Sequence, residues 1–194
     1  HGHLRDKRHE VVGHTARVFA DWARDLVRAA DERAKPDALR MPRYTDARIA
    51  VVERAITGAQ PAEPDFERLN LEIWLLKLRD NLSVDDPTVQ RILNGQNPEQ
   101  VAARLAQSRL GDPVFRRQLW AGGAAAVAAS DDPMIVFVRS WDADARRVLE
   151  QFETQVEGPV ARAHERIARA RFRAFGTNTY PDATSTPRVT YGRV

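Results

Sequence analysis

The sequence has no cysteine among its 194 residues, which excludes a disulfide framework and thiolate chemistry. Lysine is scarce as well, because Lys7, Lys35 and Lys77 are the only lysines among 30 basic residues. No apolar run approaches the roughly 20 residues that a membrane-spanning helix needs, so we expect no membrane span. The reactive groups that remain are carboxylates, hydroxyls, imidazoles, arginine guanidinium groups and three lysine amines.

The charges are nearly balanced, with 30 basic and 27 acidic residues and a net charge of +3. A nucleic-acid surface would need basic residues gathered on one face. Here the two signs alternate, and we interpret them as a solvated helix surface with i,i+4 pairs. The pattern is clearest at Asp21, Arg24, Asp25, Arg28, Asp31, Glu32 and Arg33. We therefore expect no nucleic-acid partner.

Apolar spacings of three, four and seven predict three helices in the first half of the chain. The first covers residues 9–33, with an apolar stripe at Val12, Phe19, Trp22, Leu26 and Ala30. The second runs from a cap at Thr45 to Ile56, and Gly58 ends it.

The third helix, residues 65–81, carries an unusually wide apolar stripe. Its principal positions are Phe66, Leu69, Ile73 and Leu76, with Leu82 beyond its end. Trp74, Leu75 and Leu78 widen the stripe, which favours burial of this helix on more than one side.

A short acceptor side chain directly before proline then recurs four times. It predicts helix starts at Asp86-Pro87, Asn97-Pro98, Asp112-Pro113 and Asp132-Pro133, where the side chain caps free N–H groups and proline suits the first turn. Gln100 completes a capping box with Asn97. Breaks are expected at Gly95, Gly111 and Gly122-Gly123.

The final helix is predicted from about Ala145 to Ala174, with a kink or restart at Gly158-Pro159 and an end at Gly176. Its stripe includes Phe152, Val156, Val160 and Ile167. After residue 176 the composition changes, and residues 184–191 alternate like a strand. The fold class predicted is mainly α, an irregular multi-helix domain with a C-terminal β-strand segment.

No reactive constellation stands out. His9 and His14 resemble the zinc motif H-E-x-x-H but are five apart, so they point about 140° apart on a helix. His164 reads as a surface residue. Ser83, Ser108, Ser130, Ser140 and Ser185 lack the glycine context of a nucleophile. We expect no catalytic residue, no metal site and no cofactor.

Three other features have structural explanations. The acid pairs Asp85-Asp86 and Asp131-Asp132 are explained by capping, and Gly122-Gly123 lacks the lysine of a phosphate loop. We expect the four tryptophans, Trp22, Trp74, Trp120 and Trp141, to be core residues.

One block is distinctive. The segment R-A-R-F-R-A-F-G-T-N-T-Y-P-D-A-T, residues 169–184, with P-R-V-T-Y-G at 187–192, resembles the bacterial dipeptidyl-peptidases of the seven and eleven type. Segments 32–36, 128–133 and 157–159 are similar to the same family's helical region. Two departures stand in the block, Ser185 where relatives usually have Phe and Pro187 where they have Leu.

The resemblance implies a chymotrypsin-like serine exopeptidase that releases dipeptides from peptide N-termini, with a helical cap inserted in a double β-barrel. Residues 1–176 would be part of the helical cap domain, and residues 177–194 the start of the second catalytic β-barrel segment. The family's triad residues have no counterpart in these residues, so the chain alone is expected to be inactive. Substrate-binding residues and side-chain preference are unknown.

The implied partners are peptide substrates, the remainder of the catalytic domain and a possible homodimer, in the periplasm or secreted. Loops 35–44 and 176–182 are hinge candidates. The alternative is a free-standing helical binding or scaffold protein.

Overall fold

The structure is a computed structural model that describes residues 18–59 and 62–176. Helices dominate it, and the predicted mainly α class is confirmed for these residues. The predicted strand 184–191 lies outside them. The α-helices are α2 (Val18–Glu32), α3 (Asp46–Thr57), α4 (Pro64–Leu82), α5 (Pro87–Leu93), α6 (Pro98–Leu105), α7 (Pro113–Ala129), α8 (Pro133–Phe152) and α9 (Gly158–Phe175). The short elements are the 3-10 helices η2 (Asp37–Leu39), η3 (Pro42–Tyr44) and η4 (Arg109–Gly111) and the π-helical turn η5 (Glu153–Glu157).

The chain divides into two compact units between Phe152 and Glu153. The first contains α2 to α8, and the second contains η5 and α9. The predicted domain boundary after residue 176 adjoins residues outside the described part and stays a prediction.

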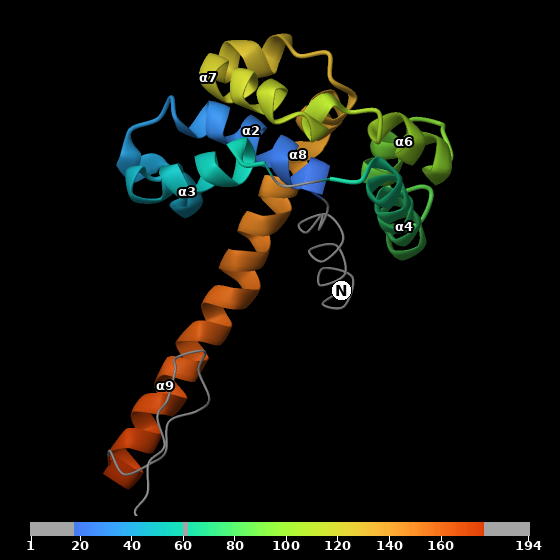
Figure 1. The fold of residues 1–194 in the computed structure, drawn as a ribbon. Coiled ribbons are helices and arrows are strands. Elements are labelled where there is room, and N and C mark those ends of the chain that lie inside the picture. The colour runs from blue at the N-terminus through green and yellow to red at the C-terminus, as the bar shows by residue number, and fades with distance from the viewer. Residues whose placement is uncertain (1–17, 60–61, 177–194) are drawn as a thin grey trace, which may run out of the picture. The chain divides into compact units, whose positions relative to one another are not determined.

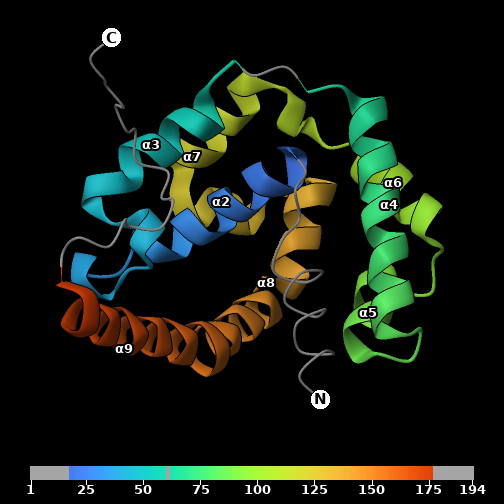
Figure 2. The same ribbon diagram turned by 90° about the horizontal axis from the view of Figure 1, so that it is seen from below.

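Helix α2 is the centre of the first unit. It contacts α3, α7 and α8 (Figure 1, Figure 2). Its predicted stripe is confirmed where it is described, because Phe19, Trp22, Leu26 and Ala30 are all buried. Such a stripe contributes stability in proportion to the apolar surface that it removes from water.

A second group of helices joins this centre through α8. Helix α4 packs side by side with α6, and α5 and α6 both contact α8 (Figure 1, Figure 2). Trp74 of α4 lies with its ring centroid 6.2 Å from that of Phe137 and 5.9 Å from that of Trp141, both on α8. Helix α8 is therefore shared by the two groups.

The predicted burial of α4 is wrong on one side. Leu71, Leu75 and Leu78 are buried against the neighbouring helices, whereas Phe66 and Leu69 are 64% and 48% exposed. The sequence offers two apolar stripes on this helix, and contact with α6 selects the one through Leu71. The other stripe lies open in the described unit.

The four predicted acceptor–proline starts are all present. The carboxylates of Asp86 and Asp112 accept from the N–H groups of Thr88 and Val114. Asn97 forms the predicted capping box with its residue three positions on. Helix α3 differs, because the Thr45 hydroxyl donates to the carbonyl of Pro42 and Asp37 accepts from the N–H of Asp46 instead.

Glycines interrupt the helical backbone at two places, in α7 and at the start of α9. Gly123 has φ 57° and ψ −142°, so α7 is kinked where the glycine pair predicts a break. Helix α9 restarts at Gly158 after the π-helical turn and ends at Gly176, where φ is 66°. The predicted stripe of this helix is exposed in the described unit, with Val160 and Ile167 at 47% and 57%.

Within the described part, no single helix is long and apolar enough to span a membrane. Only α7 taken with the helical run 133–175 meets that test of length and composition, and this pair is sharply bent at its break.

The N-terminus of α8 is organised by Asp132, which is buried. One oxygen of this carboxylate accepts from the Ser108 hydroxyl at 2.8 Å, and the other accepts from the N–H of Arg109 at 2.7 Å. The backbone N–H groups of Met134 and Ile135 also donate to it, at 3.0 and 3.3 Å. One side chain thus caps α8 and ties η4 to it.

We expect Asp132→Ala to lower the free energy of unfolding by about 3 kcal/mol, because it removes a cap and leaves buried donors without an acceptor. The matched variant Asp112→Ala removes an exposed cap that accepts from Val114 alone and should cost about 1 kcal/mol. Urea unfolding measures both, and equal losses would contradict the assignment.

Candidate functional site

Helices α2 and α8 are joined by a chain of buried charges. The Nε of Arg28 donates to Asp142 Oδ1 at 2.7 Å, and the Nε of Arg146 donates to the other oxygen, Oδ2, also at 2.7 Å. Arg28 and Asp142 are both buried. Taking such groups out of water is costly, and it is tolerated because each charge keeps an opposite charge in contact.

The chain of charges continues to Glu32, which is fully buried. Its Oε1 accepts from Arg146 Nη1 at 3.2 Å and from Lys35 Nζ at 2.6 Å, and its Oε2 accepts from the N–H of Met41 at 2.7 Å. Burial by itself raises the pKa of Glu32. The hydrogen bonds from Lys35 and Met41 and the charges of Lys35 and Arg146 outweigh it, so the pKa is lowered from its ordinary value.

A second acid of α2, Asp25, holds the loop that follows this helix. Its two oxygens accept from Arg43 Nε and Nη2 at 3.1 and 2.6 Å, and its Oδ1 accepts from the Tyr44 hydroxyl at 2.8 Å. Burial, and then the charge of Asp25, raises the pKa of Tyr44 above its ordinary value. Together with the Met41 contact, these bonds favour a fixed connection at 35–44 over the hinge expected there.

The interpretation of α2 as a solvated charged surface is therefore wrong for Asp25, Arg28 and Glu32. All three are buried, and their partners include residues far away in the sequence. Spacing along one helix could not reveal this, because the partners lie on α8 and in the loop. Asp21 and Arg24 do form the expected local pair, at 2.6 Å.

Arg116 of α7 is also a buried cation, but its partners are backbone carbonyls and an aromatic ring. Its guanidinium donates to the backbone carbonyls of Ile56, Gly58 and Leu110 and lies 3.7 Å from the ring centroid of Trp22. Ile56 and Gly58 stand at the C-terminal end of α3, where the helix dipole favours positive charge. Burial lowers the pKa of Arg116.

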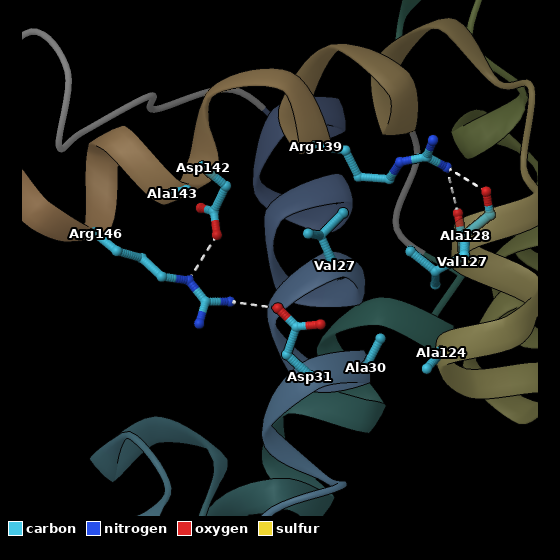
Figure 3. A pocket seen from close by; sticks show the side chains of 10 residues that line it. All are labelled: Val27, Ala30, Asp31, Ala124, Val127, Ala128, Arg139, Asp142, Ala143 and Arg146. Atoms are coloured by element: carbon cyan, nitrogen blue, oxygen red, sulfur yellow. Dashed lines mark hydrogen bonds and ion pairs between the residues drawn. The ribbon is translucent and has the colours of Figure 1, made fainter.

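A pocket of about 400 Å³ opens where α2, the end of α7 and α8 meet. Figure 3 shows α2 between the two other helices, with Val27 and Ala30 facing the hollow. Its apolar wall consists of Val27, Ala30, Ala124, Val127, Ala128 and Ala143. The charged residues are Asp31, Arg139, Asp142 and Arg146.

The small side chains of the second half of α7 leave this space open. That half begins after the kink at Gly123, which sets its direction relative to the first half. A hollow with an apolar wall and a few charged groups is the usual form of a small-molecule site. The pocket is therefore the candidate binding site of this unit.

The histidines considered for chemistry do not build a site. His9 and His14 lie outside the described residues, and His164 is exposed on α9. In the described part of the chain, no group of three His, Asp or Glu side chains is placed to hold a metal ion.

The described serines have structural roles. The Ser108 and Ser140 hydroxyls donate to Asp132 and to the carbonyl of Phe137. The hydroxyl oxygens of Ser83 and Ser130 accept from the backbone N–H groups of Asp85 and Asp132. Asp86 and Asp132 are caps, as predicted, and Ser185 lies outside the described residues.

All four tryptophans are buried, as predicted, at 8% exposure or less. Sequence reasoning did not find the pocket. The sequence signals that bear on it are the alanines that follow Gly122-Gly123 and the i, i+7 pair Arg139 and Arg146, which share one face of α8.

A sequence model of the family Peptidase S46 matches residues 4–194. The chain belongs to this peptidase family, and the resemblance to dipeptidyl-peptidases is confirmed at the level of the family. No curated protein matches the chain.

The low pKa of Glu32 makes stability depend on pH. Because the folded-state pKa lies below the ordinary value of 4.5, the carboxylate contributes fully above that value, and its contribution is lost as pH falls through the folded pKa. We expect Glu32→Gln to be less stable than the parent chain at pH 7 and to lose less stability on acidification. Thermal unfolding between neutral pH and about pH 3 measures both effects.

Glu53→Gln is the control for this prediction, because Glu53 is exposed on α3. Its unfolding should follow the parent chain at every pH. A Glu32→Gln curve parallel to that of the parent would contradict the role of Glu32.

Proposed function

We propose that this chain is the helical lid region of a serine dipeptidyl-peptidase that releases dipeptides from the N-termini of peptides. The family match over residues 4–194 carries the proposal. The family supports dipeptidyl aminopeptidase function; the lid role and the serine mechanism are our inference.

The contacts of the described serines support a catalytic centre built by other parts of the peptidase. Ser108 and Ser140 donate to partners that complete helix ends and turns, and His164 is exposed on the second unit. A Ser-His-Asp triad needs the serine hydroxyl within hydrogen-bond reach of a histidine. None of the four described serines has such a contact.

The architecture of the first unit suits a lid. Its helices are held by one continuous core and by the buried charges between α2 and α8. A unit of this kind moves as a rigid body, and lid closure of that type excludes water and commits the substrate. We propose that the enzyme works in the periplasm or outside the cell, that it acts on peptides and that it forms a homodimer.

The assignment of the nucleophile is tested with a fluorophosphonate probe, which labels activated serines. We expect the 194-residue chain to remain unlabelled, and the intact peptidase that carries it to be labelled at a serine outside these residues. Peptide mapping of the labelled protein locates the site. Labelling of Ser83, Ser108, Ser130 or Ser140 would refute the proposal.

The lid role is tested by hydrogen exchange on the intact peptidase with and without a dipeptide product. We expect bound dipeptide to slow exchange in amides of the first unit that face the catalytic domain, while buried amides around Leu26 stay unchanged. The control is the same enzyme with a dipeptide acetylated at its amino terminus. Equal protection in all three samples would count against a lid.

A further inference from the structure

The pocket of the first unit has two different ends. Arg139 lies at one end, where α8 faces the last turn of α7 (Figure 3). Asp31 of α2 lies at the other, next to Arg146 (Figure 3). Between them the wall is apolar.

Arg139 carries a charge that the described structure does not neutralise. Its Nη1 donates to the carbonyls of Val127 and Ala128 at 2.8 and 2.7 Å, at the C-terminal end of α7. These acceptors fix the side chain but bear no full charge. Among the described residues no carboxylate pairs with Arg139, and its exposed guanidinium has further donors to offer to an anion.

Asp31 is the complementary group. Its side chain is 63% exposed and has one long ion pair, from Oδ2 to Arg146 Nη2 at 3.4 Å. Arg146 is engaged more closely by Asp142, at 2.7 Å. The Asp31 carboxylate therefore keeps acceptor capacity for a second cation.

The helix rise gives the length of the pocket along α8, and this length limits the ligand. Arg139 and Arg146 are seven residues apart on one helix, so their Cα atoms are about 10 Å apart along its axis. An extended dipeptide spans about 7 Å of backbone, and hydrogen bonds at each terminus add to this reach. A longer peptide would project beyond the pocket.

We propose that this pocket binds a dipeptide with both termini free, the carboxylate on Arg139 and the ammonium on Asp31. The apolar wall, including Val27, Ala30 and Ala124, receives an aliphatic side chain. The specificity is for free chain ends, because the cation and the anion at the two ends of the pocket contact both termini together, and the length of the pocket along α8 favours a short peptide.

This proposal rests on the proposed function, because a dipeptide is the product of a dipeptidyl-peptidase. The lid then carries a product site built entirely from the first unit. A ligand at this site would contact the α2–α8 network directly, because Asp31 and Asp142 both pair with Arg146.

The site is tested on the 194-residue chain by titration while the NMR methyl signals of Val27 and Val127 are followed. The probes are alanyl-valine, its C-terminal amide, its N-acetyl derivative and a hexapeptide ending in Ala-Val. We expect alanyl-valine to shift these signals, and each of the other three to bind about tenfold more weakly, because a charge-assisted hydrogen bond or the fit is lost. Equal binding of all four, or no shift with alanyl-valine, would overturn the proposal.

Two substitutions assign the ends. In Arg139→Gln the free acid and the amide should bind equally, and in Asp31→Asn the free amine and the N-acetyl derivative should bind equally. Loss of discrimination is the readout, since a general loosening would weaken all probes alike. The control Arg48→Gln removes an exposed charge on α3 and should preserve both preferences.

A second pair of variants tests the pocket without changing its charges. Ala124→Leu fills the hollow, and the matched Ala125→Leu places the same side chain on an exposed neighbouring position that does not line it. Binding should be lost in the first and kept in the second. Binding kept in Ala124→Leu would place the ligand elsewhere.

The outcomes separate the two proposals. If the intact peptidase releases dipeptides while the chain fails to bind alanyl-valine, only the product site is wrong. If the chain binds alanyl-valine but the intact protein releases no dipeptide, the site stands and the proposed function fails.

Discussion

The buried pairing of Arg28 with Asp142 is the contact on which the first unit depends. It fixes α2 against α8, two helices whose paired residues stand 114 positions apart. Replacing both partners by well-fitting apolar groups can be neutral, but removing one leaves a buried charge without compensation. The pair therefore contributes mainly by allowing one arrangement of α2 on α8. Because α8 also carries Phe137 and Trp141, which contact Trp74 of α4, the same arrangement positions both groups of helices.

Local features of this fold were predictable and long-range ones were not. The caps at Asp86, Asn97 and Asp112 depend on a few neighbouring residues, so the sequence indicates them directly. The open stripe of α4 could not be distinguished from the buried one, because the choice is made by α6. The charged residues of α2 were likewise predicted to be solvated, because their partners are far away in the sequence. Their partners are specified by the tertiary fold, and periodicity within one helix holds no information about them.

The candidate pocket depends on both local and long-range features. The glycine pair and the alanines after it predict a break and small side chains, but a hollow appears only when α2 and α8 close on that segment (Figure 3). Membership of peptidase family S46 places the helical unit in a peptidase. The lid role that we propose would assign binding and movement to this unit and bond cleavage to the catalytic centre. A unit whose hydroxyls and carboxylates are engaged in caps and ion pairs is well suited to that division of labour.

The hydrogen bonds of Arg116 differ from those of the α2–α8 network in their response to pH. Its acceptors are peptide carbonyls, which have no protonation equilibrium in the accessible range, and a guanidinium stays charged in acid. Acid therefore does not remove the hydrogen bonds that join α3 to α7 through Arg116, whereas protonation of Glu32 removes the charge that its partners contact. The contact of α3 with α7 is therefore insensitive to acid, while the part of the α2–α8 contact that depends on Glu32 weakens once the pH falls below the ordinary carboxyl range.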